Sequence, residues 1–232
     1  MSKIYRDVEQ GSSLWYKLRM GIPTSSMFHK IITPGGKLSE QRKGYMYRLI
    51  AERLLLESMS PSITVEWVEH GKEMQPSAEQ NFQFQNDVVL ERVGFVMDDN
   101  GRVGCSPDAL IKDRNEAVEI KCPAPWTQIG YLLDGLGTDY KPQVQGQIAV
   151  GGFERVHFYA YHDRMPAVHL VTLPDPSYLK ILVRLVSDFC EELDYYTERA
   201  RSLGAYVANP GFTTPHEETA PGPDPLQIII PE

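Results

Sequence analysis

Apolar residues recur along this chain with two different spacings, and the change from one spacing to the other outlines its elements. Helical spacing, with apolar side chains three or four positions apart, predicts helices at 39–57, about 69–86 and 175–203. Alternating and continuous apolar runs predict strands at 88–97, 102–111, 116–122, 155–162 and 167–173. The two spacings together therefore predict an α/β protein.

Glycine, proline and small polar residues mark where these elements begin and end. Gly21-Ile22-Pro23 divides residues 12–32 into two short helices. We expect Ser39 to cap the helix 39–57, and Asp139 to cap a helix that ends at about residue 151. Asn100-Gly101 is a hairpin turn sequence.

Length and composition limit the domain organisation. With 232 residues, of which 42% are hydrophobic, the chain can bury one sizeable core or two small ones. The last 29 residues hold six prolines, which is typical of an extended or disordered arm. We expect a single domain over 1–203 and a proline-rich tail over 204–232.

Cysteine use and the N-terminal sequence favour a soluble cytoplasmic protein with no membrane partner. Cys105, Cys122 and Cys190 are an odd number without a Cys-x-x-Cys pair, which favours reduced thiols. The N-terminus lacks an apolar secretion segment, and no run of about 18 apolar residues follows. The net charge of −8, taken alone, argues against a nucleic-acid binder. Net charge is an average, however, and an enzyme that keeps carboxylates for metals can confine its basic residues to one groove.

The stretch GCSPDALIKDRNEAVEIKCPAP, residues 104–125, carries the candidate chemistry. A hairpin can bring Asp108 beside Glu119, and two such carboxylates repel unless a proton or a divalent cation lies between them. Oxygen ligands suit Mg²⁺ or Mn²⁺, and the backbone carbonyl of Ile120 offers another ligand. Lys121, on the same strand face as Glu119, can orient a water or stabilise charge on a phosphate.

Each part of this pattern also has an ordinary explanation. Glu-x-Lys arises by chance roughly once in a few hundred positions, and alone it is more often the solvated face of a strand. Asp108 after Ser-Pro is, alone, most often a turn residue. The combination on one hairpin is what favours a site.

Pro107-Asp108 followed by Glu119-Ile120-Lys121 resembles the motif of PD-(D/E)XK nucleases. Three blocks in order along about residues 8–150 narrow the match: EQGSSLWYKLRMGIPTSS, GCSPDAL with VEIKCP, and YKPQVQGQ. They resemble the phage lambda exonuclease, or YqaJ-type viral recombinase, family of alkaline exonucleases. The C-terminal 30 residues lie outside the resemblance.

The resemblance implies both a fold and an activity. The fold is a mixed central β-sheet flanked by helices, an α/β (α+β) protein with a PD-(D/E)XK, restriction-endonuclease-like core. The activity is a Mg²⁺-dependent, processive 5′→3′ exonuclease on double-stranded DNA with 5′-phosphorylated ends. Such an enzyme leaves a 3′ overhang for a single-strand annealing protein and forms a toroidal homotrimer. A bacterial host or a prophage would encode it.

The resemblance also implies roles for individual residues. Asp108, Glu119 and the Ile120 carbonyl would hold a pair of Mg²⁺ ions, with Mn²⁺ able to substitute. Lys121 would position the nucleophile. Further residues fall into two groups. Tyr140 and Gln143 would line the active site, and Arg19, Ser26 and Ser106 would grip the terminal 5′-phosphate. Trp15 is interpreted as a core residue.

One family position departs from the pattern. A glutamate that completes the metal site in the family is replaced here by Gln75, which is followed by Pro76. A glutamine carbonyl can hold a metal or a metal-bound water, but it brings no charge. Glu73 or Glu79 could substitute if the helix is displaced, so the third ligand stays open.

Two other functions also fit the hairpin. An endonuclease or resolvase could use the same residues, and cleavage of covalently closed DNA would separate it from an exonuclease. A DNA-binding scaffold with a vestigial acidic site is the other, and the intact Asp108, Glu119 and Lys121 argue against it.

Overall fold

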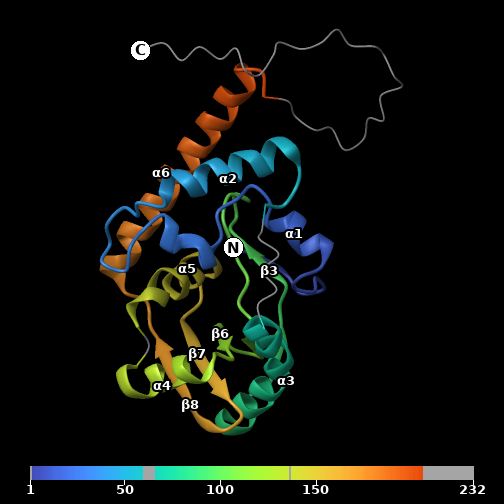
Figure 1. Ribbon diagram of the computed structural model, residues 1–232, viewed down its shortest axis with the longest axis vertical. Coiled ribbons are helices and arrows are strands. Elements are labelled where there is room, and N and C mark those ends of the chain that lie inside the picture. Colours follow the sequence, from blue (N-terminus) through green and yellow to red (C-terminus); the bar gives the residue numbers. More distant parts are fainter. Residues whose placement is uncertain (1, 60–65, 136, 206–232) are drawn as a thin grey trace.

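The computed structural model describes residues 2–59, 66–135 and 137–205 as helices around two β-sheets (Figure 1). The helical elements are α1 (Ser13–Arg19), η1 (Ser25–Lys30), α2 (Arg42–Leu55), α3 (Glu66–Asn86), α4 (Pro125–Asp134), η2 (Thr138–Tyr140), α5 (Lys141–Gly151) and α6 (Pro176–Ser202). The strands are β1 (Lys3–Tyr5), β2 (Leu90–Arg92), β3 (Phe95–Met97), β4 (Gly104–Cys105), β5 (Ala109–Ile111), β6 (Glu116–Lys121), β7 (Arg155–His162) and β8 (Met165–Thr172).

The larger sheet has five strands in the order β2-β5-β6-β7-β8. Its neighbours pair antiparallel except β6 and β7, which run parallel because α4 and α5 connect them as a crossover. The smaller sheet is antiparallel, in the order β1-β3-β4. The predicted mixed sheet flanked by helices is confirmed.

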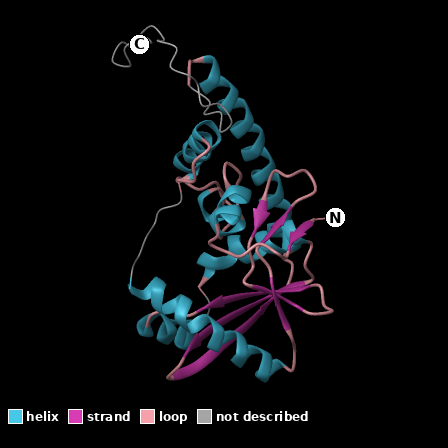
Figure 2. Cartoon of the chain, turned by 90° about the vertical axis from the view of Figure 1, so that its right-hand side faces the viewer, coloured by secondary structure: helices cyan, strands magenta, loops and turns pink. Residues whose placement is uncertain are grey.

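Alternating side chains of β6 and β7 serve two cores, one on each face of the larger sheet. On one face, Val118 and Tyr159 pack with Phe82 of α3. On the other, Val156 and Phe158 belong to the main core, against which α4 and α5 pack. Helices therefore cover both faces of the sheet, as the side view shows (Figure 2).

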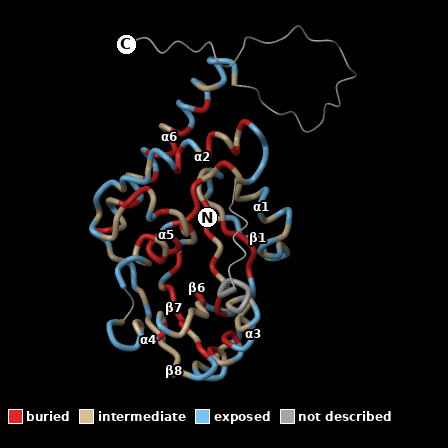
Figure 3. The backbone as a smooth tube through the Cα atoms, viewed as in Figure 1, coloured by how far each residue is buried: buried red, intermediate tan, exposed pale blue. Residues whose placement is uncertain are grey.

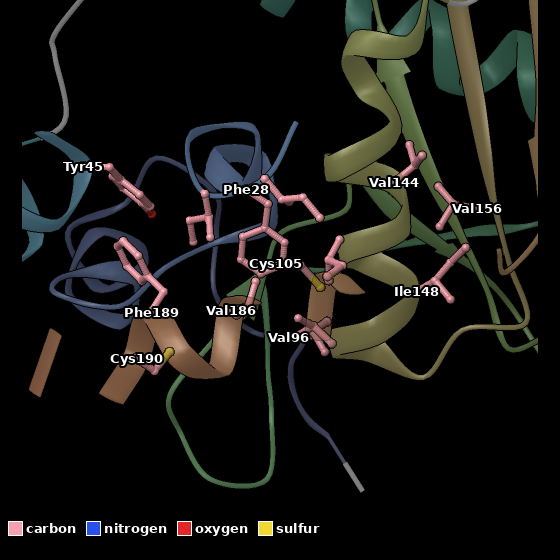
Figure 4. Close-up of a cluster of buried hydrophobic side chains, with 14 of the residues drawn as sticks. Phe28, Tyr45, Val96, Cys105, Val144, Ile148, Val156, Val186, Phe189 and Cys190 are labelled. Carbon is pink, nitrogen blue, oxygen red and sulfur yellow. The ribbon is translucent and has the colours of Figure 1, made fainter. Parts of the chain in front are cut away.

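The main core continues past α5 to α2 and α6. Val144 and Ile148 of α5 face Val156, while Tyr45 of α2 stacks on Phe189 of α6 with ring centroids 5.6 Å apart (Figure 4). Gly146 allows α5 to approach η1, since a Cβ there would lie 2.5 Å from the Phe28 ring. Buried positions accordingly gather along α5, β6 and β7 (Figure 3).

Two predicted strands are each divided between the sheets. The segment 88–97 breaks after Arg92, where Gly94 lies against the N-terminal segment and a Cβ would come within 2.0 Å of the Val8 carbonyl oxygen. The segment 102–111 breaks at Ser106-Pro107, because proline has no N–H to donate to a strand partner. The Asn100-Gly101 turn between β3 and β4 is confirmed.

Helix termini differ more from the sequence-based expectations. Ser39 does not cap α2: its hydroxyl accepts from the Gln41 N–H, and the helix begins at Arg42. Asp139 lies inside η2 and makes no capping hydrogen bond to α5. Helix α4 was not predicted, and α3 continues through Pro76.

The remaining sequence-based expectations concern the tail, the cysteines and the membrane. The predicted tail falls, from residue 206 on, outside the described residues, so the domain boundary stays a prediction. All three cysteines lie in the described ranges, and each has a free thiol as predicted. In the described ranges, no helix has the length and apolar character needed to cross a membrane.

Candidate active site

The hairpin of β5 and β6 brings Asp108 to Glu119. Ala109 pairs with Val118, and the Asp108 N–H donates to the Val118 carbonyl over 3.0 Å. The Asp108 side chain also bonds to β6, where its Oδ2 accepts from the Ile120 N–H over 2.7 Å. The predicted hairpin geometry is therefore present.

Glu119 is 3% exposed and is held by three donors. Lys121 Nζ and Gln143 Nε2 donate to Oε1 over 2.5 and 2.7 Å, and Gln147 Nε2 donates to Oε2 over 2.5 Å. Both glutamines lie on α5, four residues apart. Residues at i and i+4 share a helix face, so both side chains reach the same carboxylate. Helix α5 therefore fixes the rotamer of the central carboxylate.

Mutual repulsion and burial shift the ionisation of this group of residues. Burial, and next the charge of Glu119, raise the pKa of Asp108 to about 7. Burial lowers the pKa of Lys121, but the carboxylates of Glu119 and Asp108 outweigh it, so the net shift is upward. Lys121 is therefore an ammonium at neutral pH, suited to orienting a water or stabilising an anion and not to accepting a proton.

The same residues fit a divalent cation. The charge repulsion that raises the pKa of Asp108 is what a cation between the two carboxylates relieves. The N–H and C=O of one strand residue point to the same side, so the Ile120 carbonyl faces the side on which its N–H meets Asp108. Within the described ranges, no three Asp, Glu, His or Cys side chains form a ready-made metal cluster. A cation would thus need carbonyl, amide or water oxygens as well.

Helix α3 supplies an amide on the other side of Asp108. Gln75 and Asp108 line one cavity of about 500 Å³. Gln75 Nε2 donates to Glu79 Oε1 over 3.4 Å, which leaves Gln75 Oε1 as the oxygen for a cation. Glu73 is exposed, and Glu79 is buried and paired with Arg92. The geometry favours Gln75 over the two glutamates as the third position.

A second group of predicted residues forms a pocket around Arg19. Arg19 Nη1 donates to Ser106 Oγ over 2.9 Å, and Nη2 donates to Thr24 Oγ1 over 3.3 Å and Ser26 Oγ over 3.2 Å. Burial lowers the pKa of Arg19, but a guanidinium ordinarily loses its proton only far above neutral pH, so the group stays charged. A charged fork surrounded by hydroxyls is suited to a phosphate.

Trp15 belongs to this pocket, and the prediction of a core role was wrong. Its ring is half-buried, the Arg19 guanidinium carbon lies 4.1 Å from the ring centroid, and its Nε1 donates to Ser106 Oγ over 3.0 Å. Ser106 Oγ thus accepts two hydrogen bonds, which leaves its own proton to donate to an anion.

The Thr24–Ser26 segment contributes the hydroxyls of its side chains to the Arg19 pocket, and it adds no α-helix N-terminus that could bind a phosphate. The second of the two short helices predicted within residues 12–32 is present as η1, a 3-10 helix of six residues. The Met27 N–H already bonds to the Thr24 carbonyl.

Tyr140 lies near Lys121 but at the rim of the site. It ends η2, immediately before α5, and its ring centroid is 5.9 Å from Lys121 Nζ. Its hydroxyl accepts from the Tyr131 hydroxyl over 3.0 Å. Gln143, by contrast, bonds directly to Glu119. The structure thus places both residues at the site, Gln143 against the carboxylate and Tyr140 beside Lys121.

A comparison with models of protein families identifies the family of this chain. The profile of the YqaJ-like viral recombinase domain matches residues 14–154, more than half of the chain. The chain belongs to this family. The matched segment includes the Arg19 pocket, both carboxylates and Lys121, so the family resemblance of the sequence is confirmed.

The solved structures to which this YqaJ-like domain is similar are exonucleases. An alkaline exonuclease from Laribacter hongkongensis is 26% identical with a TM-score of 0.73, and the match covers 84% of this chain and 98% of that one. The same exonuclease in complex with dAMP is 27% identical, with a TM-score of 0.73 and coverage of 83% and 98%. A phage-related exonuclease from Haemophilus somnus 129PT shares the fold, with a TM-score of 0.57, 14% identity and coverage of 81% and 99%. No curated protein matches the chain.

The sequence-based reasoning missed three site residues of this YqaJ-like domain. Gln147 could have been found from its spacing, because it lies four residues after Gln143 on the same helix face. Gln10 and Arg92 had no such indication. Gln10 Nε2 donates to the carbonyls of Val93 and Pro107 over 2.9 Å each, across chain separations that no local pattern shows.

Proposed function

We propose that the chain is a Mg²⁺-dependent 5′→3′ exonuclease that acts on the 5′-phosphorylated ends of double-stranded DNA. Hydrolysis joins a water oxygen to the phosphorus of the first phosphodiester and breaks its bond to the 3′ oxygen, which gains a proton. The products are a 5′-mononucleotide and a strand with a new 5′-phosphate. Family membership and the alkaline exonuclease structures support this proposal.

The observation that carries the proposal is the position of the Arg19 pocket beside the carboxylate pair. Ser106, bonded to Arg19, lies two residues before Asp108. Even a fully extended chain separates their Cα atoms by about 7 Å at most. A pocket suited to a terminal phosphate so near the candidate metal ligands favours cleavage at a 5′ end over cleavage within a duplex.

Each group has a role in this reaction. Bound at Asp108, Glu119, the Ile120 carbonyl and Gln75, a pair of Mg²⁺ or Mn²⁺ ions would neutralise phosphate charge and lower the pKa of a water. Gln143 and Gln147 hold Glu119 in place. The Lys121 ammonium orients the attacking water and stabilises charge that develops on the phosphate.

Hydrolysis of labelled duplexes tests the proposal. We expect mononucleotides from blunt linear duplex with Mg²⁺, and none from the same duplex in a chelator or from covalently closed circles. Cutting of the closed circle would instead identify an endonuclease, and DNA binding without hydrolysis under any metal condition would identify a scaffold.

The family resemblance extends the proposal to assembly and partners. We expect a cyclic homotrimer that encloses the duplex, works processively and passes the 3′ overhang to a single-strand annealing protein. Light scattering at working concentration should return three protomer masses. A monomer mass there would contradict the ring.

A further inference from the structure

We propose that Arg92 is a second phosphate-binding residue, which holds the next phosphodiester of the cut strand beyond the scissile one. This inference rests on the proposed function and adds to it a contact that aligns the strand over the carboxylates. It is carried by a salt bridge between α3 and β2 that the two-carboxylate site does not use.

Arg92 is anchored beside the candidate metal ligands. It is the last residue of β2 and pairs with Ala109, the residue after Asp108. Glu79 of α3 accepts from Arg92 Nε over 3.0 and 3.1 Å and from Nη2 over 2.9 Å. The guanidinium orientation is thereby fixed before any ligand binds.

The exposure of this pair is strongly asymmetric. The Glu79 side chain is 12% exposed, whereas the Arg92 side chain is 66% exposed. Here a buried carboxylate holds a guanidinium at the surface.

One edge of the guanidinium is left for a ligand. Nε and Nη2 bond to Glu79, and in the described part of the chain Nη1 makes no hydrogen bond. Arg92 lines the cavity of about 500 Å³ that also contains Gln75 and Asp108. A phosphate entering this cavity would meet a charged donor already turned to its position.

The order of groups along the chain identifies which phosphate this is. The Arg19 pocket is fixed at Ser106, the carboxylate is at Asp108, and Arg92 lies opposite Ala109. The Cα atoms of Ser106 and Ala109 are at most about 11 Å apart, even in a fully extended chain. If the terminal phosphate occupies the Arg19 pocket and the scissile phosphate lies at Asp108, Arg92 meets the following phosphodiester.

A duplex with a single neutral linkage tests this assignment. The substrate carries a methylphosphonate at the second phosphodiester from a 5′-phosphorylated end and a label on its first nucleotide. The kcat/KM for release of this first nucleotide, before the modified linkage becomes the scissile one, is compared with that of the natural duplex. We expect wild type to lose about tenfold or more on the modified duplex, the scale of a lost hydrogen bond to a charged group. Arg92→Ala should be slow on both duplexes, with a ratio near one.

Two variants separate this role from a structural one. Arg114→Ala removes an exposed arginine at the far end of the β5–β6 hairpin and should keep the wild-type ratio. Arg92→Ala alone leaves the buried Glu79 carboxylate without its partner and could unfold the protein. The double variant Arg92→Ala with Glu79→Gln removes that charge as well, so the ratio can still be measured. It too should show a ratio near one.

The possible failures can be told apart. Equal kcat/KM of wild type on the natural and the modified duplex would show that Arg92 only pairs with Glu79. A wild-type ratio in the Arg92 variants would show the same, and either result would overturn the inference. If wild type hydrolyses neither duplex with Mg²⁺, the proposed function fails, and the inference fails with it.

Discussion

Lys121 Nζ lies 2.5 Å from Oε1 of Glu119, so two residues of one strand face form an ion pair at the centre of the site. The pair exists because β6 alternates its side chains, which places positions 119 and 121 on the same side. Its carboxylate is also bonded to two glutamines of α5. The charged groups of the proposed reaction are thus assembled before substrate binds.

Replacing Lys121 with alanine should lower turnover by about 10²-fold or more while DNA and metal binding stay nearly intact. The reason is that the ammonium acts on the water and on developing charge, and neither contact holds the DNA. Steady-state hydrolysis at saturating Mg²⁺ gives the turnover. Lys112→Ala, an exposed lysine at the turn of the same hairpin, is the control and should behave as wild type. More than half of normal turnover in Lys121→Ala would show that Lys121 has no catalytic role and only pairs with Glu119.

Gln75→Glu should lower the Mg²⁺ concentration that gives half-maximal activity. A carboxylate at this position adds charge to a site that now offers only an amide oxygen. A titration of activity with Mg²⁺ measures the midpoint. Glu73→Gln removes an exposed carboxylate from the same helix and should leave the midpoint unchanged. An unchanged midpoint in Gln75→Glu would place residue 75 outside the metal site.

Mg²⁺ binding should weaken as the pH falls below neutral. The pKa of Asp108 is raised to about 7, so below this pH the metal-free site holds a proton that a cation must displace. For one displaced proton, calorimetry should show roughly tenfold weaker binding at pH 6 than at pH 8. Asp108→Asn should bind weakly with no such dependence. Equal wild-type affinity at the two pH values would contradict the ionisation of Asp108 described above.

The hairpin was predictable from the sequence because its information is local. Asp108, Glu119 and Lys121 lie within one strand–turn–strand segment, where the alternation of side chains decides which groups meet. Gln143 and the Arg19 pocket required the family resemblance, since the contact of Arg19 with Ser106 joins segments 87 residues apart.

The errors arose where tertiary contacts override local pattern. The break of 88–97 depends on Gly94 meeting Val8, and neither residue predicts the other. Trp15 was interpreted as a core residue, yet its contacts with Arg19 and Ser106 bring it into a polar pocket. The Arg92–Glu79 bridge likewise needs α3 to lie beside β2, which no spacing within either element indicates.

Recognition of the chain end should depend on Arg19. Wild type should prefer duplexes with a 5′-phosphate over those with a 5′-hydroxyl, and Arg19→Ala should erase that preference. The loss on the phosphorylated substrate should be about 1.5–3 kcal/mol, the cost of a charged hydrogen bond, with little change on the hydroxyl end. Lys17→Ala, an exposed lysine on the same helix, should keep the preference.

The rates of mononucleotide release from these two ends, by wild type and by Arg19→Ala, therefore test the central claim most directly. The account predicts a clear preference for the phosphorylated end in wild type and equal rates in the variant. Equal rates on both ends in wild type, or equal slowing on both ends in Arg19→Ala, would contradict 5′-end recognition by this pocket.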